Sequence, residues 1–242
     1  MKFVILMIFL LGMTFLANEN ARSQDIYPIS SGELIFSFAD VEKGDVDVPS
    51  LMRFTLFFHY GQFWHFDLNN NVGFFTGGAI RNVGLITRED NIYEGSQYDE
   101  DLKIKRRSYT LGVPLALKSG SFSKNFYIYG GGEYELLFHY KEKIFVEDRK
   151  VKSTEWMSDK TNRFVPSLFA GIQFPGGINV KFKYYLDDFL NRNYKVIQDG
   201  STIQPFKNMQ SRVFYISLHW NFKTGKMKDV IKADNIKTYA GM

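Results

Sequence analysis

Two places in the sequence combine side chains that could carry out nucleophilic or acid–base chemistry. Ser217 and His219 stand two residues apart, and Glu133, Glu135 and His139 lie in one short stretch. A hydroxyl beside an imidazole is half of a nucleophilic triad, which also needs an acid that converges on the histidine from elsewhere in the fold. The sequence contains no Gly-x-Ser-x-Gly turn of the kind that exposes a serine nucleophile. We therefore expect no catalytic residues and no enzyme activity.

Metal, cofactor and nucleic-acid binding are not indicated either. The four histidines lack helical ligand spacing, and the absence of cysteine excludes disulfide scaffolds and thiolate zinc sites. Residues 87–101 are acidic, which suits either a solvated loop or loose divalent-ion binding. The net charge of +4 is small and scattered, so nucleic acid is not an expected partner.

The segments that must position these side chains are β-strands. Aromatic residues make up 17% of the chain, and polar and apolar residues alternate with period two between clusters of turn residues. Gly61 and Pro114 interrupt two of the segments, and we expect a β-bulge at each. Eight strands are predicted, at residues 33–40, 51–68, 72–86, 102–118, 125–144, 163–174, 177–186 and 211–222.

The connections between these strands alternate between short and long. Short turns follow the second, fourth and sixth strands, whereas residues 41–50, 87–101, 145–162 and 187–210 form longer links. This alternation is typical of transmembrane barrels, with short periplasmic turns and longer outer loops. The predicted fold is therefore all-β: a single antiparallel up-and-down transmembrane β-barrel of eight strands. A soluble periplasmic barrel or sandwich is the structural alternative.

One face of each strand is apolar, so the charged face must line the interior if the apolar face meets lipid. An eight-stranded barrel has an interior only wide enough for side chains to fill it. Buried charges need partners, which predicts a plug of paired charges and no open pore; a narrow ion path is the alternative. The predicted interior charge network comprises Arg53, Asp67, Arg106, Lys118, Glu133, Glu135, His139, Lys181, Lys183 and His219.

The ends of the chain predict export. A basic residue and an apolar run precede small residues at positions 21 and 23, as in a secretory signal peptide of residues 1–23; a buried helix is the alternative. Residues 24–222 would form the barrel, and residues 223–242 a basic periplasmic tail, either disordered or a docking segment. An even strand count places both termini in the periplasm.

The chain resembles the small outer-membrane β-barrel proteins of the Bacteroidota type, a porin-family or OmpA-like architecture. The resemblance rests on the predicted signal peptide, the eight alternating strands, and stretches such as residues 73–84 and 105–114. It implies that the last strand carries the signal read by the barrel-assembly machinery, with Phe214, Leu218, Trp220 and Phe222. It specifies an architecture and no particular function.

Basic residues follow the acidic loop at the expected outer rim. Lys103, Lys105 and Arg107 are candidates for contact with lipopolysaccharide phosphates. The expected partners are outer-membrane lipid, lipopolysaccharide, the assembly machinery and another outer-membrane protein. We predict a non-enzymatic structural or interaction subunit of the Gram-negative outer membrane. A small-solute pore and a lipid-modifying enzyme are the alternatives.

Overall fold

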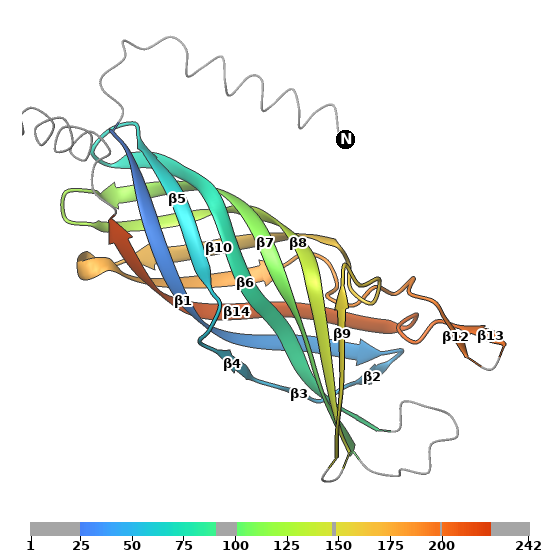
Figure 1. Cartoon of the computed structure of the whole chain (residues 1–242). Helices are drawn as coiled ribbons and strands as arrows, with labels where there is room; N and C mark the ends of the chain where they lie inside the picture. Colours follow the sequence, from blue (N-terminus) through green and yellow to red (C-terminus); the bar gives the residue numbers. More distant parts are fainter. Residues whose placement is uncertain (1–24, 91–100, 147–148, 199, 224–242) are drawn as a thin grey trace, which may run out of the picture.

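The chain forms a closed ring of eight antiparallel strands, as the computed structural model shows for residues 25–90, 101–146, 149–198 and 200–223 (Figure 1). Each strand pairs with the next ring strand along the chain, and the last pairs with the first. The predicted eight-stranded, up-and-down antiparallel fold is confirmed. The ring strands are β1 (Asp25–Lys43), β5 (Tyr60–Asp67), β6 (Val72–Asp90), β7 (Asp101–Ser121), β8 (Phe126–Val146), β10 (Phe164–Gln173), β11 (Ile178–Tyr185) and β14 (Met209–Lys223).

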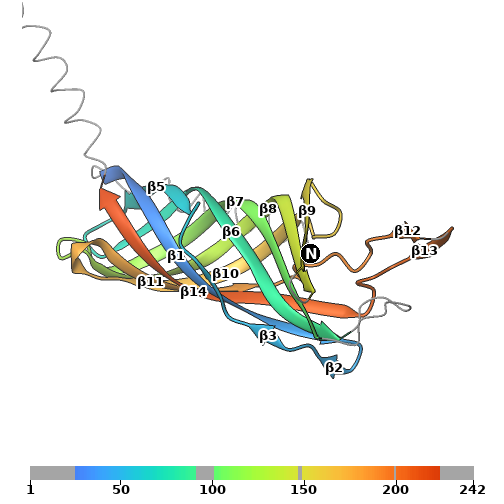
Figure 2. The same cartoon turned by 60° about the horizontal axis from the view of Figure 1, so that its bottom comes forward.

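The two ends of the ring differ in their connections. Residues 68–71, residues 122–125 and the 3-10 turn η1 (Pro175–Gly177) form tight links at one end, which we call the short-turn end. The start of β1 and the end of β14 also lie there (Figure 1). At the opposite, long-loop end, β9 (Arg149–Trp156) pairs with β8, and β12 (Val196–Gln198) forms a projecting hairpin with β13 (Ser201–Ile203) (Figure 2).

Several predicted features differ from or fall outside this description. The links at residues 145–162 and 187–210 contain β9 and the β12–β13 hairpin, which their weak alternation did not predict. The predicted signal peptide, almost all of the predicted tail and most of the acidic loop lie outside the described residues. Within the described residues, no helix has the length and hydropathy needed to cross a bilayer.

The second strand of the ring is interrupted where one continuous strand was predicted. Its outer part consists of β3 (Ser50–Leu51), which pairs with β6, and β4 (Arg53–Thr55), which pairs with β1. Residues 56–59 leave the ladder, and Phe58 has a φ of 66°, which is rare for a bulky residue. Gly61 itself pairs in register with both neighbouring strands, so the bulge predicted there is wrong.

A β-bulge also lies in the pairing of β7 with β8, but not at Pro114. Pro114 pairs in register with Glu133, whereas the register shifts between Tyr109 and Thr110. The shift inserts one extra residue into β8 and reverses the direction of every side chain beyond it.

The outer wall of the ring is apolar. Large hydrophobic side chains are exposed on all eight ring strands; on β7 they are Leu111, Val113, Leu115 and Leu117. We call this surface the apolar belt. All three tryptophans of the chain are exposed: Trp64 and Trp220 towards the short-turn end, and Trp156 at the long-loop end of the belt. Aromatic residues at both edges of an apolar band are typical of proteins that cross a bilayer.

The interior is filled by three layers of side chains. Near the short-turn end, aromatic residues pack together, among them Phe63, Phe75, Tyr127, Tyr129 and Phe169. Charged residues occupy the middle of the lumen. Aliphatic and aromatic residues fill the long-loop end, among them Ile35, Val83, Leu85, Leu137 and Val213.

Candidate functional site: a charged layer in the lumen

Four ring strands supply the charged middle layer. Glu33 comes from β1, Arg81 from β6, Glu133 and Glu135 from β8, and Lys181 and Lys183 from β11. All six side chains are buried, and the side chain of Arg81 is only 2% exposed. They face inward because successive side chains of a strand point to opposite faces, and the neighbouring residues on each strand face outward into the apolar belt. Period-two alternation therefore places three carboxylates and three cations at one level of the lumen.

Arg81 is the centre of the charged layer. Its Nε lies 2.7 Å from an oxygen of Glu33, and its Nη1 lies 2.5 Å from Glu133 and 3.1 Å from Glu135. Lys183 Nζ bridges the same two β8 carboxylates, at 2.7 Å and 2.5 Å. The remaining cation, Lys181, lies 2.9 Å from Glu33. Every carboxylate of the layer thus contacts at least two cations.

The layer is close to electrical neutrality. Three negative charges face three positive charges, so no net charge remains for the low-dielectric interior to solvate. The hydroxyl of Tyr185 donates to Glu135 over 2.6 Å, and the ring of Tyr215 lies 5.5 Å from Lys181 Nζ. Charge balance and these added contacts are what a buried ion network requires to persist.

Ser217 and His219 meet in this layer, but not as a catalytic pair. Ser217 Oγ lies 3.0 Å from His219 Nε2, and Glu33 lies 3.1 Å from the same nitrogen. In a triad the acid orients the histidine through Nδ1, which here faces the hydroxyl of Ser31 at 3.1 Å. Ser217 is also fully buried. The contacts are those of a buried hydrogen-bond network that joins β1 and β14.

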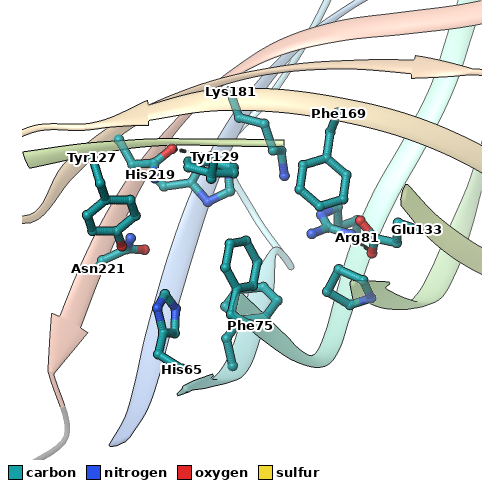
Figure 3. Close-up of a pocket in the computed structure, with 13 residues that line it drawn as sticks. His65, Phe75, Arg81, Tyr127, Tyr129, Glu133, Phe169, Lys181, His219 and Asn221 are labelled. Carbon is teal, nitrogen blue, oxygen red and sulfur yellow. Dashed lines mark hydrogen bonds and ion pairs between the residues drawn. The ribbon is translucent and has the colours of Figure 1, made fainter. Parts of the chain in front are cut away.

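The space left between the aromatic and charged layers is small. Figure 3 shows Phe75, Tyr129 and Phe169 gathered beside Arg81 and Lys181. The cavity between them has a volume of about 30 Å³, and a second one near Leu137 measures about 10 Å³. A single water needs roughly 10–15 Å³ of such space. These cavities hold a few waters at most.

Two further ion clusters lie nearer the ends of the lumen. At the short-turn end, Lys118 Nζ lies 2.5 Å from Asp67 and 2.9 Å from the hydroxyl of Tyr27. At the long-loop end, Arg106 contacts Glu89 and lies 3.0 Å from Glu142. The predicted interior residues Asp67, Arg106 and Lys118 therefore belong to separate clusters.

Two members of the predicted network lie elsewhere. His139 pairs with Tyr109 on the outside of the ring, where it stacks on the Tyr109 ring and packs at a tilt against Trp156, because the bulge in β8 reverses its direction. Tyr140 takes the inward place instead. Arg53 lies in the wall, where it donates to the carbonyl and side-chain oxygens of Asn82 at 3.0 Å and 2.6 Å.

Glu33 and Arg81 are the two charges of the middle layer that the sequence pattern did not predict, and Glu89 and Glu142 in the cluster around Arg106 were not predicted either. Glu33 lies on the face of its strand opposite to the apolar face, so alternation alone could have placed its side chain in the lumen. Arg81 gave no such signal, because Val83 and Leu85 on the same face are apolar and glycines obscure the other face.

The residues predicted at the surface lie on the outer wall. Leu218, Trp220 and Phe222 of β14 are exposed in the apolar belt, and Phe214 stacks on Phe38. The predicted lipopolysaccharide contacts Lys103, Lys105 and Arg107 face outward on β7, beyond the long-loop edge of the belt.

Beyond the ring, the turn after β9 has its own ion pair. Burial alone would raise the pKa of Glu155, but hydrogen bonds donated by Lys160 at 2.8 Å and Ser158 at 2.5 Å lower it. In the part of the chain that the structure describes, no three His, Asp or Glu side chains are close enough to hold a metal ion.

Fold and site define a closed eight-stranded antiparallel barrel with an apolar wall and a charged, filled lumen. No protein-family model and no curated protein matches the sequence. Solved structures with a similar fold include Ail of Yersinia pestis in complex with the heparin analogue sucrose octasulfate, with 12% identity, a TM-score of 0.37 and coverage of 81% of this chain and 99% of that one.

Two other structures are similar to the same degree. Neisserial surface protein A has 9% identity and a TM-score of 0.37, over 81% of this chain and 96% of that one. The outer membrane protein OprG from Pseudomonas aeruginosa has 13% identity and a TM-score of 0.36, over 83% and 97%. With TM-scores below 0.5, these similarities assign neither a family nor a function.

Proposed function

We propose that this chain is an outer-membrane β-barrel of a Gram-negative envelope, of the Bacteroidota type, and that it acts there as a non-enzymatic structural or interaction subunit. The observation that carries the proposal is the inverted polarity of the ring. Apolar and aromatic side chains are exposed on the outside, while charged side chains are buried inside. Hydrocarbon solvates such a wall, whereas water would leave it as an unusually large apolar surface.

The filled lumen favours a structural role over a pore. Three layers occupy the interior, and the two small cavities between their side chains hold only a few waters. Conduction would require the neutral ion network around Arg81 to be broken, which leaves buried charges without partners. A small-solute pore remains the alternative to be tested, and a lipid-modifying enzyme is disfavoured by the buried Ser217.

The first experiment is gentle detergent extraction of the native membrane, followed by tagged pull-down and mass spectrometry. We expect the protein in the outer-membrane fraction together with stoichiometric partners from the envelope. Recovery there without partners would favour a self-sufficient barrel and contradict the role as a subunit. Recovery in the soluble fraction would refute the membrane assignment.

Planar-bilayer recording tests the filled lumen separately. The purified barrel should give no steady single-channel conductance, while an open porin recorded in parallel gives discrete steps. Steady conductance by the wild-type barrel would replace the structural role with the pore.

A further inference from the structure

A basic groove lies on the outer wall where the second strand of the ring is interrupted. Its volume is about 460 Å³. Residues 53–58 form one side, and the outward-facing side chains of β7 and β8 form the other. Five basic side chains of the wall line the groove: Arg53, Lys105, Arg107, Lys141 and Lys143. The fold opens this groove because residues 56–59 leave the ladder between β1 and β6.

The cations of the groove differ from those of the lumen in their surroundings. Among the described residues, no carboxylate forms an ion pair with any of its five cations. Arg106 also borders the groove, but its side chain is paired with Glu89 and Glu142. This contrasts with the lumen, where every carboxylate of the middle layer contacts at least two cations.

The register of the sheet sets like charges against each other at the groove. Lys105 lies directly opposite Lys143, and Arg107 lies directly opposite Lys141. Lys143 also faces Lys152 on β9, so three lysines form one row across three strands. Like charges in directly opposed positions destabilise a sheet. Such pairs persist at low cost where an anion lies over them and supplies the missing negative charge.

The other side of the groove is apolar and exposed. Phe57 and Phe58 are each 71% exposed, and Leu56 is half exposed. Phe58 packs edge-on against Tyr109, and the next outward residues along β7 are Leu111 and Val113 of the apolar belt. The apolar side of the groove is therefore continuous with the surface that we assign to lipid.

We infer that this groove binds a phosphorylated glycolipid of the outer leaflet, with its phosphates on the cations of β7 and β8 and its acyl chains along Leu56–Phe58 and the belt. An amphiphile matches the two chemistries that the groove brings together. The groove also lies at the edge of the belt, where the proposed membrane location would bring it next to the lipid headgroups. The inference rests on the proposed membrane location and adds a defined site and ligand class.

Native mass spectrometry tests the inference on the barrel extracted in a non-ionic detergent. The probes are a bisphosphorylated hexa-acyl lipid A and the same lipid without its phosphates. The first variant is Lys105→Ala with Lys143→Ala, and the second is Arg107→Ala with Lys141→Ala. The matched control, Lys124→Ala with Lys207→Ala, removes the same charge from two exposed sites that do not line the groove. A heat-dependent gel shift confirms that each protein is folded.

We expect the phosphorylated lipid to remain bound to the wild type and to the control. Each groove variant should lose about tenfold in occupancy, because two charge-assisted contacts are removed. Equal binding of the dephosphorylated lipid, equal binding by the folded groove variants, or no binding to the wild type would each overturn the inference. The extracted protein is used, so these outcomes are independent of the fractionation that tests the membrane location.

Discussion

The substitution Arg81→Met tests whether the charged layer holds the barrel together. Methionine replaces the side chain with an apolar one and removes one of three cations from the layer. Glu33, Glu133 and Glu135 are then opposed by two lysines only, and one negative charge is left uncompensated in a buried site. Removing one partner of a buried ion pair costs about 3–5 kcal/mol. The ratio of folded to unfolded barrel should therefore fall by roughly two to four orders of magnitude.

The assay is urea unfolding of the barrel in lipid vesicles, followed by tryptophan fluorescence. The matched control is Arg212→Met, which makes the same chemical change at an exposed position of β14. Surface substitutions of this kind change stability by about 0.5 kcal/mol or less. The midpoint of the control should stay near that of the wild type, and the midpoint of Arg81→Met should fall sharply.

A double variant isolates charge balance from packing. Arg81→Met with Glu133→Gln leaves two carboxylates and two lysines in the layer, so the net charge returns to zero. We expect the double variant to be more stable than Arg81→Met alone by at least about 1 kcal/mol, a coupling typical of residues in one network. A single variant that loses less than about 1 kcal/mol, or a double variant that is no better, would refute the role of the ion network.

Three further predictions follow from the wall. Gly84→Ala should lower the free energy of unfolding in urea by about 1–3 kcal/mol or more, because a Cβ there would lie 2.1 Å from a backbone oxygen of the facing strand. The control Gly78→Ala on the same strand should change it little, because nothing lies within 4 Å of a Cβ at that position. Equal effects of the two substitutions would contradict the register. Lys143→Glu should stabilise the delipidated barrel in neutral detergent at low salt by a few tenths of a kcal/mol, since it faces lysines on both neighbouring strands; an unchanged midpoint would mean that the like charges cost nothing. Variants that retain Trp156 or Trp220 alone should both be quenched by brominated lipids, most strongly by bromines near the headgroup, and quenching strongest at the bilayer centre would contradict their place at the edges of the belt.

Alternation in the sequence predicted most of the fold, because every position of a barrel strand faces either the lumen or the outer wall. Lys181 and Lys183 alternate with Val180, Phe182 and Tyr184, and the structure buries the first two in the lumen. Such a pattern predicts strand type and direction together. The segment boundaries also give the lengths of the links, and the short ones indicate adjacent antiparallel strands, because only such strands can be joined by a tight turn.

The pattern fails where one residue changes the parity or where both faces carry similar residues. The bulge beside Thr110 places His139 outside, and nothing in the local composition distinguishes Phe138 from an ordinary outward residue. Arg81 was missed because the strand around it is apolar or glycine-rich on both faces. The grouping of the lumen charges into three clusters depends on the stagger between strands, which a single sequence does not encode locally.

The distribution of charge separates the part of the barrel that maintains the fold from the part available to a partner. In the middle layer of the lumen, Arg81, Lys181 and Lys183 are paired with an equal number of carboxylates. This layer therefore has no excess charge that a charged ligand would neutralise. On the outer wall, Lys105 and Lys143 are opposed across the sheet without a carboxylate partner among the described residues, beside phenylalanines that are left exposed. A barrel whose task was to pass a solute would place its unbalanced charge inside, where it could select ions. Here the unbalanced charge and the exposed aromatic side chains lie together on the outside. This arrangement of charge therefore supports the proposal that the barrel acts through contacts on its outer wall rather than by passing a solute through its lumen.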